Sequence, residues 1–290
     1  MNSYLWVDYS NNMLWVCFGG LNENMTKKAL VYPTPEHQKA ADVITEYFVN
    51  HYNIDAVLLV NSCARGKATQ DSCLDIVVLA EQVGERSLLG ELEAGWVKLE
   101  RTSEAIQNLY KVGKYSVIHP DFISGNFIPS EQDEVAGPDD FELQVGNFLA
   151  HSIPLWQGND YLTQLKKKWL PYYDEELRQH RLERVRWFCL NNLHHIPLYI
   201  ERGLYFQSFD RLYNAYQEFL QALFIARQTY PIAYNKWIHE QIVEILGLPE
   251  LYEQITHLFE IKIFESSEIA DKGREVEELL EKYAPLPVAR

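Results

Sequence analysis

Side chains that could bind a phosphate group are concentrated in residues 57–79, VLLVNSCARGKATQDSCLDIVVL. Two apolar runs, 54–60 and 74–80, have the length and composition of buried strands. The first run ends at Asn61 and Ser62, and a turn of small residues lets backbone N–H groups approach a phosphate closely. We therefore expect a phosphate-binding turn between two strands.

Acidic side chains lead the second apolar run. If the chain is already extended at residue 71, strand alternation places Asp71, Cys73 and Asp75 on one face of the sheet. Oxygen ligands on one rigid face, beside a phosphate-sized turn, suit Mg²⁺, which binds a few carboxylates together with waters and substrate phosphates. The pattern therefore predicts a magnesium and phosphate site.

In order, spacing and strand context, these residues resemble the nucleotidyltransferase superfamily that includes polymerase β and the aminoglycoside and lincosamide nucleotidyltransferases. The family signature is a Gly-Ser turn after a strand, then Ala-Arg-Gly, then Ser-Asp-hydrophobic-Asp at the start of the next strand. The matching residues here are Asn61-Ser62, Ala64-Arg65-Gly66 and Ser72-Cys73-Leu74-Asp75. Members carry another carboxylate on a later strand, and the resemblance assigns that role to Asp121.

The resemblance implies roles for several residues. Asp75 and Asp121 would be the catalytic carboxylates that bind Mg²⁺, and the turn at Ser62 would hold the β- and γ-phosphates of a nucleoside triphosphate. Arg65 would offset phosphate charge, or would instead pair with a local acid such as Asp71. The implied nucleotide-binding residues are Asn61, Ser62, Arg65, Ser72, Cys73 and Lys236.

Two residues depart from the family signature. Asn61 replaces the turn glycine; asparagine tolerates a left-handed backbone but brings a side chain close to the phosphate. Cys73 replaces the first of the paired aspartates, and a thiol is a poor ligand for Mg²⁺. Asp71 could partly substitute for it; otherwise Asp75 and Asp121 would hold one metal ion with triphosphate oxygens. A role for Cys73 as a small apolar filler is favoured over a nucleophile, because no base lies near it in sequence.

The N-terminal part alternates strands and helices. Residues 1–129 therefore predict a nucleotidyltransferase-like α/β domain on a mixed β-sheet. Its expected elements are a hairpin over 3–9 and 13–19, a helix opened by Thr34 and Pro35, the two strands above, a helix over 90–110, and a third strand from Tyr115 to Ile118 that runs on into Asp121.

The C-terminal part carries a different pattern. The acidic segment 130–140 predicts a linker, and beyond it a period near 3.6 predicts a helical bundle domain over 141–290, so that the fold class is α+β. Glu218 could act as a general base, but a carboxylate on a helix surface is the favoured interpretation. Helices are expected near 141–152, 159–169, 171–191, 203–229, 236–246, 248–260 and 267–283, with Pro154, Pro171, Pro197, Pro231 and Pro249 between them as helix breakers.

Composition and charge exclude some classes of partner and some cellular locations. The 290 residues contain 26 Lys and Arg but 41 Asp and Glu, so the formal charge is −15. Such a chain repels duplex phosphate, and we expect no nucleic-acid partner. The N-terminus lacks a secretory leader, no apolar run is long enough to span a membrane, and the four cysteines are too far apart for a disulfide framework. We expect a cytoplasmic protein with no membrane partner, and the oligomeric state stays open.

These observations together predict a Mg²⁺-dependent nucleotidyltransferase. It would transfer a nucleoside monophosphate, AMP from ATP as the leading choice, to a hydroxyl group of a small molecule or a protein. The acidity of the chain mildly favours a cationic acceptor such as an aminoglycoside. Cys73 leaves an alternative open, a catalytically impaired nucleotide-binding regulatory or sensor protein of the same fold. A metal-free interaction scaffold is a third interpretation, and it predicts no nucleotide affinity.

Overall fold

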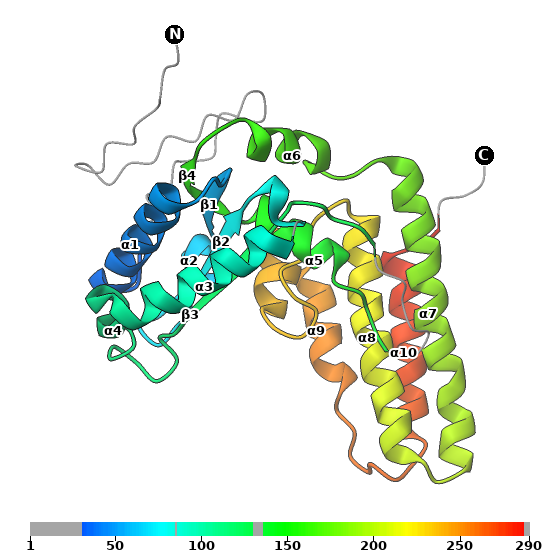
Figure 1. Ribbon diagram of the computed structural model, residues 1–290. Helices are drawn as coiled ribbons and strands as arrows, with labels where there is room; N and C mark the ends of the chain where they lie inside the picture. Colours follow the sequence, from blue (N-terminus) through cyan, green and yellow to red (C-terminus); the bar gives the residue numbers. More distant parts are fainter. Residues whose placement is uncertain (1–30, 85, 130–135, 287–290) are drawn as a thin grey trace. The chain divides into compact units, whose positions relative to one another are not determined.

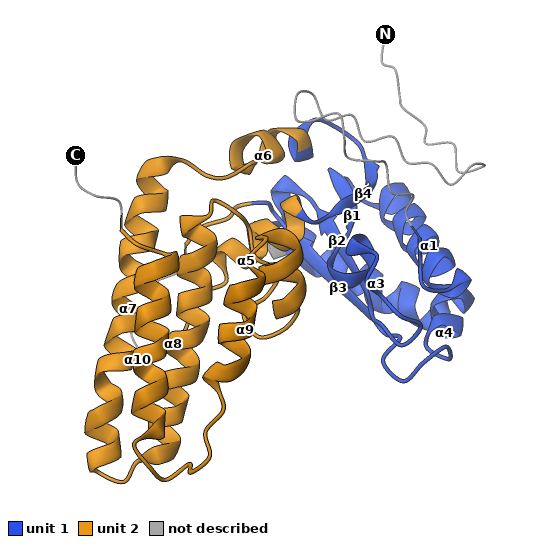
Figure 2. Cartoon of the chain, turned by 180° about the vertical axis from the view of Figure 1, so that it is seen from behind, with its two compact units in different colours: residues 1–125, 151–162 blue, residues 126–150, 163–290 orange. Residues whose placement is uncertain are grey.

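The computed structural model describes residues 31–84, 86–129 and 136–286 (Figure 1). The hairpin expected over 3–9 and 13–19 lies outside these residues, as does most of the expected linker. The chain forms two compact units: unit 1 is Met1–Gly125 with His151–Leu162, and unit 2 is Asn126–Ala150 with Thr163–Arg290 (Figure 2).

Unit 1 is built on a mixed sheet. Its described strands are β1 (Ala56–Leu59), β2 (Leu74–Leu79), β3 (Ile118–Ile123) and β4 (Ile153–Gln157), in the spatial order β3-β2-β1-β4. Strand β1 runs antiparallel to both β2 and β4, whereas β2 and β3 run parallel. Parallel neighbours need a long crossover, and helices supply it here between β2 and β3. The predicted α+β class with a mixed sheet is confirmed.

Two helices of unit 1, α1 (Pro35–His51) and α4 (Glu104–Leu109), begin at a residue whose side chain caps them. Helix α1 has Thr34 at its N-cap, where the hydroxyl accepts from the His37 backbone N–H, and Pro35 suits the first turn because it lacks an N–H. The single helix expected over 90–110 is wrong. Ser103 caps a new helix by accepting from the backbone N–H of Ile106, so that the chain forms α3 (Arg86–Thr102) and α4 (Glu104–Leu109).

One face of the sheet carries the hydrophobic core of unit 1. Alternate residues of β2, which are Leu74, Ile76 and Val78, join a buried cluster with Ile44 and Phe48 of α1. Because side chains alternate along a strand, Cys73 and Asp75 point to the opposite face. The candidate site residues Cys73 and Asp75 therefore lie on the face of the sheet that points away from α1.

Strand β4 was not predicted. Residues 153–157 follow a helix, α5 (Phe141–Val145), and a π-helical segment, Gly146–Ala150, and they pair with β1 with an irregularity at Val57/Leu58. Only five residues long and containing Pro154, the segment lacks a strand signature of its own. Its backbone is held by β1, which lies about 95 residues earlier in the chain, and such a partner is invisible to local pattern.

Unit 2 is helical. Among the described residues no helix is both long enough and apolar enough to cross a membrane. Pro197, expected between helices, lies instead inside α7 (Glu175–Glu201), on the exposed side of that helix. The remaining elements are α6 (Tyr161–Trp169), α7 (Glu175–Glu201), α8 (Tyr205–Ala226), a π-helical segment (Glu240–Ile245), α9 (Pro249–Leu258) and α10 (Glu268–Tyr283).

Helices α7, α8 and α10 run side by side around one apolar core (Figure 1). A buried arginine of α7 joins two of them: the Arg186 guanidinium donates to the backbone oxygens of Leu280 and Ala284, at 3.1 and 2.7 Å, and pairs with Glu281. The last carbonyls of a helix have no intrahelical partner and carry partial negative charge. Arg186 therefore supplies hydrogen-bond donors to the carbonyl groups at the C-terminal end of α10.

A second buried arginine of α7 holds two acids. Arg181 binds Glu142 through Nε at 2.6 Å and Asp139 through Nη2 at 2.7 Å, and all three side chains are at most 4% exposed. The remaining charge is met by neutral donors, because the Gln221 amide donates to both carboxylates and the Tyr173 hydroxyl donates to Glu142. This buried network connects Asp139 and Glu142, around the start of α5, to α7 and α8.

Replacing Arg181 by Met should destabilise the protein by about 3–5 kcal/mol, because it leaves two carboxylates buried without their cation. Urea unfolding followed by circular dichroism measures this. The matched control is Arg184→Met, an exposed arginine on the same helix, which should cost under about 1 kcal/mol. Equal losses in the two variants would contradict the role given to the buried network.

Candidate functional site

The pairing of β2 with β3 brings the predicted carboxylates to one face of the sheet. In the parallel register Asp75 lies beside His119, and Val77 lies beside Asp121. Residues two apart on a strand share a face, so that Asp75, His119 and Asp121 project from the same side. Pro120 is tolerated between the last two because β3 ends the described order of strands, where its missing N–H removes no ladder bond.

The turn after β1 begins next to Asp75. The Val60 backbone N–H donates to the Asp75 carbonyl at 3.1 Å, and the chain then enters the short helix α2 (Asn61–Arg65). Asn61 has φ of 57°, so this residue takes the left-handed conformation that sequence reasoning allowed for it. Gly66 ends α2 with φ of 69°, and its N–H donates to the carbonyls of Cys63 and Ser62. The Ser62 turn is thus adjacent to the carboxylate strand.

Cys73, which lies two residues before Asp75, contacts that carboxylate directly. Its thiol donates to Asp75 Oδ2 at 3.2 Å. Asp75 is 6% exposed, whereas Cys73 is half-buried. A neighbouring thiol, Cys63 of α2, donates to the Cys73 carbonyl at 3.5 Å; burial, and then the charges of Asp75 and Cys73, raise the pKa of Cys63 to about 12. Cys63 is therefore a protonated core residue, and its hydrogen bond holds the backbone of Cys73 just before β2 begins.

Asp121 is electrostatically coupled to the same site. Partial desolvation raises the pKa of its carboxyl, the neighbouring Asp75 charge raises that pKa further, and His119 opposes both effects. The side chain itself is exposed at the surface of the unit. Two carboxylates that repel each other across adjacent strands are a favourable place for a cation, which relieves the repulsion.

His37 anchors the chain just before Cys73, a role that sequence reasoning missed. Its ring is fully buried, with Nε2 at 2.9 Å from the Ser72 carbonyl and Nδ1 at 2.9 Å from Thr34 Oγ1. A carbonyl oxygen only accepts, so Nε2 carries a proton and donates. The histidine thereby connects the start of α1 to the residues just before β2, and its position in the first turn of an expected helix offered no signal of that contact.

Asp71 does not supply the missing ligand. Strand β2 begins at Leu74, and residue 71 lies in a turn, where its Oδ1 accepts from the Lys114 backbone N–H at 3.2 Å. The bare backbone of Gly113 permits that approach, since a Cβ there would lie 2.1 Å from Asp71 Oδ1. The Ser72 hydroxyl accepts from the Thr69 N–H at 2.9 Å and so shapes the same turn. The shared strand face for Asp71 and Asp75 was expected only if the strand began early, and β2 does not extend to residue 71.

The remaining predicted residues divide between the two units. Arg65 is the half-buried last residue of α2, in unit 1. Lys236 is exposed and belongs to unit 2, where its backbone oxygen accepts from the Gln241 side chain at 3.0 Å. Its proposed contact with a triphosphate therefore stays a prediction.

Glu218 is not a surface carboxylate, contrary to the favoured interpretation. It is fully buried in unit 2, where Oε2 accepts from the Asn192 amide at 2.9 Å and Arg211 binds the other side of that amide at 2.8 Å. Burial raises the pKa of Glu218 to about 8, against the opposing effects of Asn192 and Arg211. The side chain faces the interface between α7 and α8. We therefore assign it to the packing of the bundle and not to acid–base catalysis at the surface.

The donors on the β2–β3 face fit a hard cation only in part. Asp75 and Asp121 supply carboxylate oxygens, which suit one Mg²⁺ ion completed by waters and phosphate oxygens. Cys73 and His119 supply sulfur and nitrogen, which Mg²⁺ does not favour. A ligand atom from each of Cys73, Asp75 and His119 lies within 4.8 Å of the others. The face thus offers two different donor sets that share Asp75.

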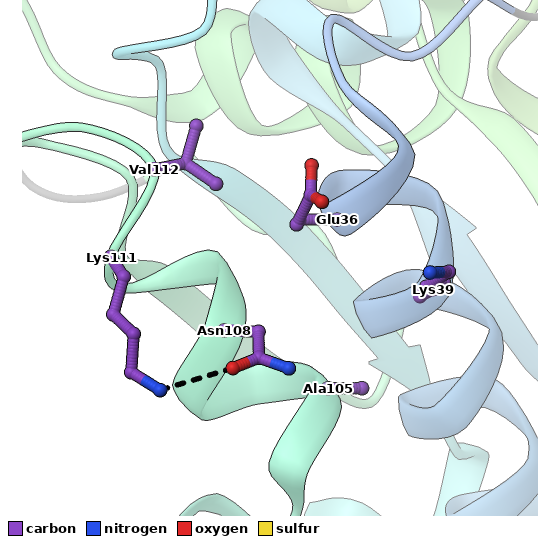
Figure 3. Close-up of a pocket in the computed structure, with 6 residues that line it drawn as sticks. All are labelled: Glu36, Lys39, Ala105, Asn108, Lys111 and Val112. Carbon is purple, nitrogen blue, oxygen red and sulfur yellow. Dashed lines mark hydrogen bonds between the residues drawn. The ribbon is translucent and has the colours of Figure 1, made fainter.

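A cavity of about 300 Å³ lies elsewhere in unit 1, between the start of α1 and the end of α4 (Figure 3). Both helices pack on the core face of the sheet, opposite Asp75. In this cavity Lys111 donates to Asn108 Oδ1 at 3.0 Å. Its lining is Glu36, Lys39, Ala105, Asn108, Lys111 and Val112, and it includes no predicted nucleotide-binding residue.

Comparisons with known proteins do not establish what this protein does. No protein-family model matches the chain, and no curated protein matches it significantly. Among solved structures, the chain is similar to a nucleotidyltransferase-like protein from Exiguobacterium sibiricum 255-15, with a TM-score of 0.42 and 13% identity, over 85% of this chain and 74% of that one. A likeness this weak carries no conclusion about activity.

The buried Glu218 predicts a pH dependence of stability. Its pKa is 4.5 in an unfolded chain and about 8 when folded, so between these values the folded state keeps a proton that the unfolded state has lost. The free energy of unfolding should therefore fall as pH rises through this window, by up to about 1.4 kcal/mol per pH unit. Glu218→Gln should lack that component when urea unfolding is measured across the window.

The control for this series is Glu183→Gln, which neutralises an exposed carboxylate on α7. Its stability should follow that of the unmodified protein at every pH. Parallel pH curves for the unmodified protein and Glu218→Gln would show that Glu218 is ionised in the folded state, against our assignment.

Proposed function

We propose that this protein is a nucleotidyltransferase, which moves a nucleoside monophosphate, AMP from ATP, to a hydroxyl group of a small molecule or a protein. The observation that carries the proposal is the parallel pairing of β2 with β3, which sets Asp75 and Asp121 on one face. The backbone of Asp75 also adjoins the start of the Asn61–Ser62 turn, which resembles a phosphate-binding turn. Paired carboxylates beside such a turn suit phosphoryl-group chemistry.

The residues of the site would divide the work. Asp75 and Asp121 would hold Mg²⁺, which when bound offsets the negative charge that develops on the transferred phosphoryl group. Asn61 and Ser62 would receive the β- and γ-phosphates, and Arg65 would add positive charge. Holding the nucleotide against a rigid sheet edge aligns it for in-line attack by the acceptor.

The charge of the chain favours one class of acceptor over another. A formal charge of −15 opposes a nucleic-acid acceptor, since polyanions need a cationic surface. It favours a cationic small molecule that carries hydroxyl groups, such as an aminoglycoside. The acceptor class rests on the proposed transfer and is tested with it.

One observation favours a second function, a nucleotide sensor. The Cys73 thiol takes the position of a carboxylate ligand and donates a hydrogen bond to Asp75 Oδ2. A site that holds fewer hard ligands could bind a nucleotide without supporting transfer. Isothermal calorimetry with ATP, with and without Mg²⁺, distinguishes this function from the transferase.

The transferase predicts release of pyrophosphate when the full chain is incubated with ATP, Mg²⁺ and a panel of aminoglycosides and lincosamides. Asp75→Asn and Asp121→Asn should each lower kcat/KM by about 100-fold or more, because each removes a charge that acts on the transition state. Asp71→Asn is the matched control: this aspartate is exposed, lies in the preceding turn, and keeps a carbonyl oxygen as acceptor for Lys114. It should retain activity.

The outcomes separate the candidate functions. ATP binding without pyrophosphate release, by the unmodified protein, would support the sensor and overturn the transferase. Turnover that appears only in Cys73→Asp would support the sensor further, since that change restores a hard ligand. No affinity for any nucleoside triphosphate would overturn both.

A further inference from the structure

We propose that Cys73, Asp75 and His119 form a binding site for a borderline-soft divalent cation, of which Zn²⁺ is the type. One ligand atom from each side chain lies within 4.8 Å of the other two. The site goes beyond the proposed function, because these three side chains define it whether or not a nucleotide binds.

The donor types select the cation. Thiolate sulfur, imidazole nitrogen and carboxylate oxygen together are ligands that Zn²⁺ accepts, whereas Mg²⁺ prefers oxygen alone. Three protein ligands leave a fourth position open for water or a phosphate oxygen, as in zinc sites that do chemistry. Cys73, whose sulfur is a poor ligand for Mg²⁺, is therefore a suitable ligand for Zn²⁺.

The spacing of the donors is close to what a tetrahedral ion needs. Metal–ligand bonds of about 2.0–2.3 Å set neighbouring ligand atoms about 3.5 Å apart. The Cys73 Sγ–Asp75 Oδ2 distance is already 3.2 Å. His119 is exposed, so its ring can turn toward these two atoms without displacing core residues.

The backbone beneath the donors is held in place. Cys73 and Asp75 lie on one face of the chain entering β2, and Asp75 is in register with His119 on β3. His37 fixes the residue before Cys73 through the Ser72 carbonyl, and Cys63 donates to the Cys73 carbonyl. Sites on rigid strands with such support hold their geometry better than sites on loops.

Binding would change one protonation state. The Cys73 thiol, which now donates to Asp75, would lose its proton to solvent, and the sulfur and the carboxylate would both turn to the metal ion. No oxidant or reductant is involved. If the proposed function holds, the soft cation and Mg²⁺ compete for Asp75, so that Zn²⁺ would inhibit Mg²⁺-dependent transfer.

The test uses Co²⁺ as a spectroscopic probe for Zn²⁺, titrated into the full chain without nucleotide. We expect one equivalent to produce tetrahedral Co²⁺ absorption in the visible range together with a thiolate-to-cobalt charge-transfer band, and we expect Zn²⁺ to abolish both. Cys73→Ser should remove the charge-transfer band. Cys73→Ser and His119→Ala should each weaken Zn²⁺ binding at least about tenfold, since even residues that only support a metal ligand contribute that much.

Two control variants show which side chains matter. Cys63→Ala removes the neighbouring thiol and should keep the charge-transfer band. Asp121→Asn should keep the Co²⁺ spectrum while it lowers the proposed transfer, so failure of the metal site and failure of the transferase are distinguishable. A band that survives Cys73→Ser, Zn²⁺ affinity unchanged in both ligand variants, or no binding by the unmodified chain would overturn the proposal.

Discussion

The parallel hydrogen bonding between β2 and β3 is the constraint that determines which polar side chains of unit 1 lie together. It sets Asp75 opposite His119 and places Asp121 one step further on the same face. A slip of one residue would turn β3's polar side chains into the hydrophobic core and its apolar ones outward. Ile118 and Phe122 pack on the core side, and burying them opposes such a slip. The hydrophobic core of unit 1 thus determines which polar groups meet on the other face.

Cys73 determines which types of donor atom that face offers. With Cys73 beside Asp75, the hydrogen-bonded pair offers one sulfur and one oxygen, and His119 adds a nitrogen. The carboxylate of Asp75 is common to a hard donor set with Asp121 and a soft one with Cys73. Unit 2 handles its buried charges differently, since the Arg181 cation pairs with Asp139 and Glu142 and the Gln221 amide donates to both carboxylates.

Local signals in the sequence predicted much of this structure. Thr34 and Pro35 marked a helix start, two apolar runs marked β1 and β2, and the short polar side chain of Asn61 allowed the left-handed backbone that the structure has. The features that were missed depend on distant partners. Strand β4 forms only against β1, Asp71 turns away to meet Lys114, and Glu218 is buried by the neighbouring helix. His119 required the register of a parallel pair, which no sequence pattern of a single strand contains.

The most direct test of the account is anomalous diffraction from crystals of the full chain soaked with Mn²⁺ and a non-hydrolysable ATP analogue, since Mn²⁺ takes the oxygen ligands of Mg²⁺ and can be located by its scattering. We predict a manganese peak in contact with both Asp75 and Asp121, with the triphosphate next to the Asn61–Ser62 turn. A peak away from β2 and β3, or carboxylates of Asp75 and Asp121 on opposite faces of the sheet, would contradict the account.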